Sequence, residues 1–217
     1  MSIKERFAQE VQKIVEEGKS VNEKIVDFVK QDYRKLLEEY DAARESIKQS
    51  THDALAGVEE GLKGAEDKAE EVLSNTAEAI VAVAHEMAQK SVEEAQKVAD
   101  EAKKLFDEAV DKTSGSIDEV EDKAKQEMEK AVEVLQKKVE EEKSKLKEVG
   151  EGIEDFLERD RRELGEKTRE ALQYHAQQIK YHILLVIDKT EIHTKKLLKH
   201  SRAAINDWLQ TLKDMFD

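Results

Sequence analysis

The chain has 217 residues, of which 41% are charged and 5% aromatic, and it contains neither proline nor cysteine. The absence of cysteine excludes disulfides, thiolate nucleophiles and thiolate metal ligands. The formal net charge of −14 argues against nucleic acid as a partner of the chain as a whole. A composition dominated by alanine, glutamate, lysine, valine and leucine, with no proline to interrupt it, is typical of long helices and coiled coils.

The first predicted helix covers residues 2–48, either as one helix or as two helices in line. Ser2 and Glu5 form a capping-box sequence at its start. Apolar residues then follow in steps of mostly three and four, which places them on one helical face. Gly18 falls on this face and is unfavourable to the helix by roughly 1 kcal/mol relative to alanine.

A second helix is predicted over residues 50–112. Ser50 or Thr51 can cap it, and Asp53 in the first turn favours the helix dipole. Its apolar stripe is rich in alanine and other small residues, which allow a neighbouring helix to approach closely. The stripe mixes seven-residue and eleven-residue spacing, which indicates a nearly straight helix with weak supercoiling.

The clearest boundary in the sequence is at Gly115, where Ser116 and Glu119 repeat the capping box. A third helix is predicted over residues 116–187 and a fourth over residues 190–216. The pattern leaves open whether a turn separates these two helices. Three glycines are candidate kinks of the third helix: Gly150, Gly152 and Gly165.

We therefore expect an all-α fold in a single domain over residues 1–217, an elongated antiparallel helical bundle or coiled coil with very long helices. Helices 50–112 and 116–187 would form an antiparallel hairpin, and helix 2–48 would fold back along it. The thinner end of such a hairpin cannot bury its apolar stripe alone. A second copy of the chain is the expected partner, in a homodimer or a larger assembly.

Four of the six histidines fall close to one line on a continuous helix. A metal ion needs ligands on adjacent helical turns, but none of these histidines has another histidine three or four residues away, and Glu-x-x-His does not occur. We predict no catalytic residue, no metal ligand and no cofactor. Two interpretations stay open, a buried stripe at a helix interface and a pH-sensitive interface. The four residues are His175, His182, His193 and His200.

The charge is distributed unevenly, with a net of +2 over residues 171–217 and −16 over residues 1–170. In the last segment basic residues lie beside apolar residues and the one tryptophan, a pattern found in helices that contact an anionic surface or a partner. The other interpretation is that this segment docks on the acidic helices of the same chain. The candidate contact residues are Lys189, Lys195, Lys196, Lys199, Arg202 and Trp208.

Residues 57–110, GVEEGLKGAEDKAEEVLSNTAEAIVAVAHEMAQKSVEEAQKVADEAKKLFDEAV, resemble the amphipathic helices of apolipoproteins, of late-embryogenesis-abundant proteins and of the phasins that coat bacterial polyester granules. The phasin resemblance implies a coat on a lipid or granule surface. The chain departs from these families in being strongly acidic. It also has regular stripes of large apolar residues in its first and third predicted helices, which favour a packed bundle.

The function expected from these patterns is that of a non-enzymatic structural or interaction protein, a helical bundle that acts through protein–protein contacts. The alternative is an amphipathic coat for lipid or storage-granule surfaces, and a stress-protective protein that folds on binding is a third class. The start of the chain has no apolar signal core, and the longest run of large apolar residues, Ile183 to Ile187, is too short to span a bilayer. We expect a soluble, cytoplasmic protein.

Overall fold

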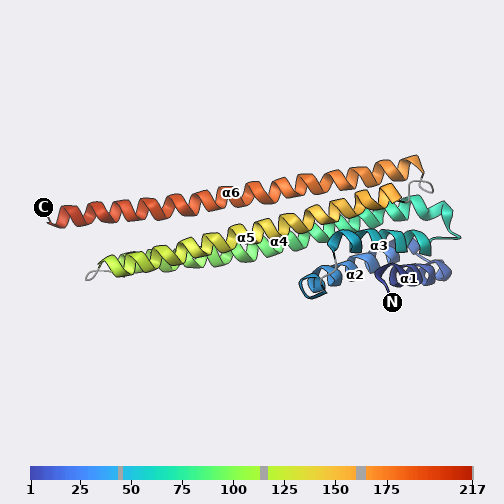
Figure 1. Cartoon of the computed structure of the whole chain (residues 1–217), viewed down its shortest axis with the longest axis horizontal. Helices are drawn as coiled ribbons and strands as arrows, with labels where there is room; N and C mark the ends of the chain where they lie inside the picture. The colour runs from blue at the N-terminus through green and yellow to red at the C-terminus, as the bar shows by residue number, and fades with distance from the viewer. Residues whose placement is uncertain (44–45, 113–116, 160–164, 217) are drawn as a thin grey trace. The chain divides into compact units, whose positions relative to one another are not determined.

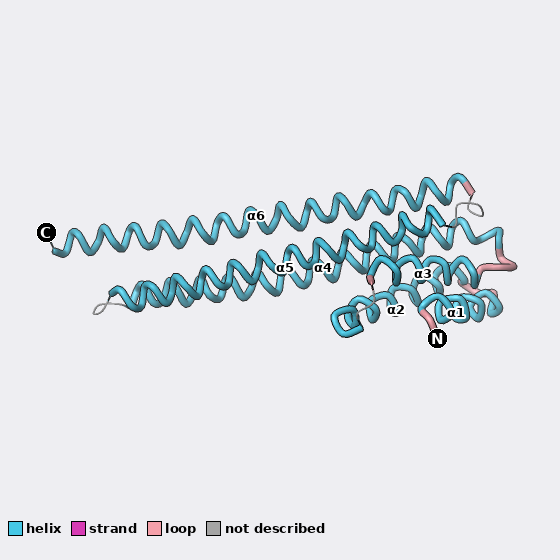
Figure 2. Tube along the Cα trace, viewed as in Figure 1, coloured by secondary structure: helices cyan, strands magenta, loops and turns pink. Residues whose placement is uncertain are grey.

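The structure, a computed structural model, describes residues 1–43, 46–112, 117–159 and 165–216, and these residues confirm the all-α fold class (Figure 2). Side chains are described throughout these ranges except at residues 40–43, 66, 67, 106, 109–112, 117–125, 186–189, 191, 198 and 200–216. The described ranges hold six helices and no strand: α1 (Ile3–Glu17), α2 (Val21–Ala43), α3 (Ile47–Gly61), α4 (Glu66–Lys112), α5 (Ile117–Arg159) and α6 (Glu166–Phe216).

The chain divides into two compact units. Unit 1 comprises Met1–Ala88 and Ser144–Leu184, and unit 2 comprises Gln89–Lys143 and Leu185–Asp217. Helices α1, α2 and α3 belong to unit 1, whereas α4, α5 and α6 each contribute one segment to each unit (Figure 1). Each unit has buried apolar side chains of its own.

The helix predicted over residues 2–48 is two helices, α1 and α2. The capping box at its start is present, since the Ser2 side chain accepts a hydrogen bond from the Glu5 N–H and the Glu5 carboxylate accepts one from the Ser2 N–H. Gly18 ends α1 with a φ of +69°, a left-handed conformation that favours glycine. This turn sends α2 back along α1 rather than in line with it, and the rings of Phe7 and Phe28 lie 5.0 Å apart between the two helices.

The helix predicted over residues 50–112 is also divided, into α3 and α4. Helix α3 begins at Ile47, so Ser50 and Thr51 lie inside it and the predicted caps are wrong. The Thr51 hydroxyl instead donates to the backbone carbonyl of Ile47 at 2.8 Å and is buried. The turn between the two helices contains Gly64, whose φ is +95°.

The predicted boundary at Gly115 and Ser116 lies outside the described residues. Helix α5 begins just after it and runs through Gly150 and Gly152 without a break, so neither glycine interrupts the helix. These two glycines serve instead as places where neighbouring helices come close to α5, as the contacts of unit 1 show.

The predicted helices over residues 116–187 and 190–216 have the wrong bounds. Helix α6 begins after Gly165 and continues through residues 188–190 to Phe216, so no turn separates the histidine-rich segment from the end of the chain. The physical reason is that residues 188–190 contain neither glycine nor proline, so no residue there disfavours the helix strongly enough to end it.

In unit 1 two glycines, four residues apart, allow α3 to cross α1 at backbone distance. A Cβ atom at Gly57 would lie 2.6 Å from the carbonyl oxygen of Lys4, and one at Gly61 would lie 2.6 Å from that of Ala8. Any larger residue would push the two helices apart. The completely buried apolar side chains around this crossing include Phe7, Val11, Leu55 and Val58.

The other side of α3 packs on α2 and α5. A Cβ atom at Gly152 of α5 would lie 2.5 Å from the Cβ of Thr51. The Tyr33 hydroxyl of α2 lies 2.6 Å from Thr51 Oγ1. Because the single hydroxyl proton of Thr51 goes to the carbonyl of Ile47, Tyr33 is the donor in this pair. Burial raises the pKa of Tyr33, so this phenol stays neutral.

The first part of α6 covers α4 and α5 in unit 1 with a narrow apolar stripe. Leu172, Ala176 and Ile179 are buried along it. Gly150 of α5 makes room for this stripe, since a Cβ there would lie 3.4 Å from Cγ2 of Ile179. Figure 1 shows α4 and α5 between α3 and this part of α6 in the view drawn. One face of this part of α6 is therefore packed against the neighbouring helices, and the opposite face is exposed to solvent.

In unit 2, α4 and α5 are joined by a polar contact. The Ser91 hydroxyl of α4 donates to the carboxylate of Glu142 at 3.0 Å, and Lys138 Nζ lies 3.4 Å from the same oxygen. Glu142 is only 5% exposed, so this pairing offsets the cost of burying its charge. Burial lowers the pKa of Lys138, but Glu142 and Glu141 raise it by more, and the net direction is upward.

Candidate functional site

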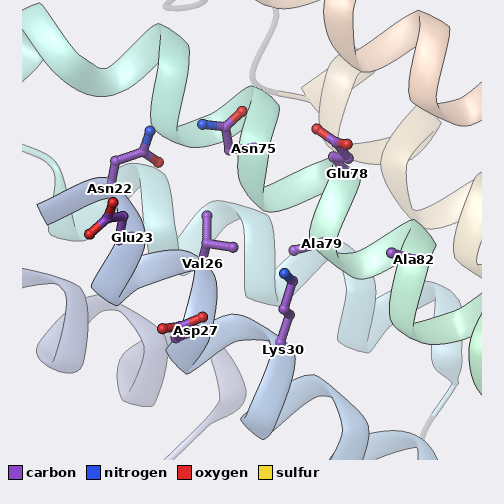
Figure 3. A pocket seen from close by; sticks show the side chains of 9 residues that line it. All are labelled: Asn22, Glu23, Val26, Asp27, Lys30, Asn75, Glu78, Ala79 and Ala82. Carbon is purple, nitrogen blue, oxygen red and sulfur yellow. The ribbon is translucent and has the colours of Figure 1, made fainter. Parts of the chain in front are cut away.

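A surface groove of about 450 Å³ lies between α2 and α4 in unit 1 (Figure 3). Two hydrogen bonds tie the helices together, from Asn22 Nδ2 to Glu71 at 2.8 Å and from Arg34 Nη2 to Glu86 at 2.7 Å. Between them, small side chains on α4 leave space. The lining residues are Asn22, Glu23, Val26, Asp27, Lys30, Asn75, Glu78, Ala79 and Ala82.

The chemistry of this groove does not point to a ligand. Its carboxylates, its lysine and its amides are spread along two helices, as Figure 3 shows, and do not converge on one point. Small-molecule sites usually combine an apolar cavity with a few polar groups directed at the same place. We assign no ligand to the groove.

Two of the four predicted histidines lie on the side of α6 that faces α4 in unit 1. His175 is 9% exposed, and the carboxylate of Glu78 in α4 acts on its charge. The ring of His182 stacks on that of His85 in α4, with centroids 4.0 Å apart. Burial lowers the pKa of His175, an effect that Glu78 partly offsets, and burial alone lowers the pKa of His182.

The contribution of His85 was missed by the sequence analysis. The signal was nevertheless present, because Glu78 and His85 are seven residues apart on α4, as His175 and His182 are on α6. Because α4 and α6 run parallel and the spacing is the same on both, Glu78 lies near His175 just as His85 lies near His182. A search for matching spacing on two predicted helices would have found the Glu–His and His–His pairs.

The remaining histidines do not join this stripe. His193, in unit 2, has its Nε2 atom 3.2 Å from Oδ1 of Asp100. The side chain of His200 lies outside the described residues. In the part of the chain whose side chains are described, no three histidine, aspartate or glutamate residues come together in a way that could hold a metal ion.

Three of the six predicted contact residues have described side chains, and all three are exposed on α6 in unit 2. They are Lys195, Lys196 and Lys199, and Ile192, one turn earlier, is 57% exposed. These positions share one side of the helix, since a helix turns by about 100° per residue. The side chains of the other three lie outside the described part of the chain: Lys189, Arg202 and Trp208.

The outward side of α6 in unit 1 carries a second exposed surface, which the sequence analysis did not assign as a site. Tyr174, Tyr181 and Leu184 are 57%, 56% and 58% exposed. Together with the exposed Gln177 they define the α6 outer face. Among the described side chains of unit 1, the only other exposed large apolar residue is Met1, at the end of the chain.

The α6 outer face is also poor in charge. Between Ala171 and Ile187 the sequence has a single Lys, Arg, Asp or Glu, which is Lys180, in a chain that is 41% charged. Lys180 Nζ lies 3.3 Å from a carboxylate oxygen of Glu154 in α5. The charge-poor run could have been found from the sequence, but which of its residues are exposed depends on how α6 packs.

Over the residues that the structure describes, no helix combines the length and the apolar character needed to cross a membrane. No protein-family model, no curated protein and no solved structure matches the chain.

Proposed function

We propose that the protein is a non-enzymatic interaction protein that binds another protein through the α6 outer face. The observation that supports this is the exposure of Tyr174, Tyr181 and Leu184 on a segment almost free of charge. Protein interfaces are depleted of charge at their centres and enriched in tyrosine, which combines an apolar ring with a hydroxyl. Solvated faces of this chain instead carry pairs such as Lys143 and Glu140, 3.1 Å apart.

The energetics agree with this proposal. Burying a large apolar side chain contributes about 1.5–3 kcal/mol, so a partner that covers the exposed tyrosines and leucine gains several such contributions. The opposite side of the helix, with Leu172 and Ile179, is buried against the rest of unit 1 and holds the outer face in place. A preformed surface lowers the entropic cost of binding. The proposal includes the cytoplasmic location expected from the sequence.

A second candidate function, a coat on an anionic lipid surface, is favoured by one observation in unit 2. Ile192, Lys195, Lys196 and Lys199 are exposed on one side of α6. Helices that lie in a membrane interface combine apolar residues with lysines in this way. Each lysine near an anionic membrane contributes about 1 kcal/mol of attraction.

Affinity purification of a tagged copy from cells that also make the untagged chain tests the first proposal, since mass distinguishes the two copies. The Tyr181→Glu variant places a carboxylate in the α6 outer face. Val134→Glu is the matched control, because Val134, on α5, is 54% exposed and receives the same charge. A partner identified by mass spectrometry with the wild type and with Val134→Glu, and lost with Tyr181→Glu, supports the proposal. Equal recovery with all three proteins contradicts it.

Flotation with vesicles of phosphatidylserine and phosphatidylcholine tests the second candidate. The lipid coat requires binding that falls by at least about tenfold when Lys195, Lys196 and Lys199 are changed to glutamate, and that weakens as salt is added. No binding of the wild type at low ionic strength would rule the coat out.

A further inference from the structure

We infer that the partner of the α6 outer face is a second copy of this chain, so that two α6 helices pack face to face in a homodimer. The inference rests on the proposed function, because it names the partner for the same surface. Three properties of the residues on this face support a second copy: their charge, their hydrogen-bonding chemistry and their spacing. The residues are Tyr174, Gln177, Tyr181 and Leu184.

The charge of the α6 outer face does not oppose a second copy, and it offers no basic or acidic patch to a charged partner. Two copies carry −14 each and repel one another over most of their surface. The α6 outer face lies in the charge-poor segment between Ala171 and Ile187, so this repulsion is weak there. An anionic lipid surface would need several basic residues beside the tyrosines, whereas the segment has only Lys180, which already lies 3.3 Å from Glu154.

The polar groups of the α6 outer face can pair with their own kind. A tyrosine hydroxyl and a glutamine amide each contain both a donor and an acceptor. In a parallel, in-register pair of helices related by a two-fold axis, each of these residues meets its own copy, so only groups with both functions can satisfy each other across the axis. Lysine, aspartate and glutamate cannot do so, and none of them occupies Tyr174, Gln177, Tyr181 or Leu184.

The spacing of these residues fits helix-on-helix packing. Tyr174, Gln177, Tyr181 and Leu184 follow in steps of three, four and three, which is the heptad pattern that forms the seam between two helices. The next two positions of this pattern in the sequence are Asp188 and Glu191, where like charges would end the seam.

The contact between the two α6 helices is short, and its length limits the affinity expected for the dimer. From Tyr174 to Leu184 a helix rises only about 15 Å. Such a contact is expected to bury less than the roughly 1,200 Å² at the lower limit of specific, stable interfaces. The dimer is therefore expected to be reversible, with a dissociation constant of the order of 1–100 μM.

Sedimentation equilibrium of the purified chain, from about 5 μM to about 500 μM, tests the inference. The wild type and Val134→Glu are expected to form dimers reversibly. Tyr181→Glu is expected to raise the dissociation constant by at least about tenfold, because two carboxylates would be buried opposite each other. Since Tyr181 is 56% exposed, the variant should keep the helicity and melting temperature of the wild-type monomer.

A cysteine variant gives an independent readout, because the natural chain has no cysteine. Gln177→Cys is expected to form a disulfide-linked dimer under mild oxidation, whereas Val134→Cys should stay at the level of random collision. A wild type that is monomeric over the whole range, or a dimer unaffected by Tyr181→Glu, would overturn the inference. The proposed function would survive either result if Tyr181→Glu still abolished the capture of a different, identified protein.

Discussion

The imidazole rings of His85 in α4 and His182 in α6 stack on each other in unit 1, with centroids 4.0 Å apart and planes inclined by 27°. The Nδ1 atom of His182 is buried and has no hydrogen-bond partner among the residues that the structure describes. A proton on His182 would therefore be poorly solvated and would lie against a second imidazole ring. The docking of α6 on α4 should depend on the protonation state of this histidine.

The first prediction is that acidification destabilises this contact. Burial lowers the pKa of His175 and His182 from the ordinary value of 6.5, so the unfolded chain takes up protons at a higher pH than the folded chain does. The free energy of unfolding is unaffected by these groups above about pH 7.5 and falls as the pH drops through 6.5. In thermal melts between about pH 8 and pH 5, the melting temperature should fall as the pH drops through this range.

The control for this experiment is the double variant His175→Gln, His182→Gln. Carboxylates also titrate towards pH 5, so the quantity to compare is the slope of melting temperature against pH near pH 6.5. We expect a shallower slope in the variant. Identical slopes would mean that neither histidine is coupled to folding.

A second prediction concerns the close crossing of α1 and α3. In Gly57→Ala the new methyl group would lie 2.6 Å from the Lys4 carbonyl oxygen and 2.7 Å from the Phe7 Cβ, both held by α1. The helices must separate, so we expect a loss of about 1–3 kcal/mol in the free energy of unfolding, despite the better helix propensity of alanine. Urea denaturation of the purified chain measures this loss.

Gly165→Ala is the control for steric crowding, because no described atom beyond its chain neighbours lies within 4 Å of the position that its Cβ would occupy. The same substitution there should change the stability by less than about 0.5 kcal/mol or increase it slightly. Equal effects at the two glycines would show that α1 and α3 do not cross closely at Gly57.

A third prediction uses the buried hydrogen bond from Tyr33 to Thr51, 2.6 Å long. Tyr33→Phe removes the donor, but the Thr51 hydroxyl keeps its own bond to Ile47, so the loss should be about 1 kcal/mol. Thr51→Val leaves the Tyr33 hydroxyl buried without this acceptor, and the loss should be larger, about 1–3 kcal/mol.

The double variant completes this cycle. When both polar groups are replaced by apolar ones, no buried hydroxyl is left unpaired, and the double variant should lose clearly less stability than the two single losses added together. Strictly additive losses, measured in urea, would indicate that the two hydroxyls are not coupled.

The sequence predicted the helical class and the start of α1, but it placed several helix ends wrongly. Local signals were sufficient at the start of α1, because the capping box of Ser2 and Glu5 involves only neighbouring residues of the chain. They were insufficient at Ser50 and Thr51, which have cap-forming side chains but lie inside α3. There the packing of Thr51 against Tyr33 and Gly152 overrides the local preference.

For the candidate sites too, the sequence predicts what lies along one helix but not what packs against it. The sequence places the four histidines near one line of a helix, but the partners of His175 and His182 lie on α4, about a hundred residues earlier, and depend on tertiary packing. The outward position of Tyr174 and Tyr181 could not be predicted either. In the sequence they look like core residues, and only the packing of Leu172 and Ile179 shows which side of α6 is open.

A fourth prediction follows from the charge of the dimer. If two copies of net charge −14 meet at an uncharged seam, their mutual repulsion is the term that salt removes. Raising the salt from about 0.1 M to about 1 M shortens the Debye length from about 10 Å to about 3 Å, and we expect the dissociation constant to fall severalfold. Sedimentation at the two salt concentrations measures it. A dissociation constant that rises with salt would instead indicate an interface held by ion pairs.

The central claim is that a protein partner covers the α6 outer face, and photo-crosslinking in the cells that make the chain tests it most directly. A benzophenone amino acid at Gln177 is flanked by Tyr174 and Tyr181 on this face, and the same group at Val134 is the control. The account predicts a cross-linked product at Gln177, composed of two copies of this chain, and none at Val134. A folded protein that gives no protein product at Gln177 would contradict it.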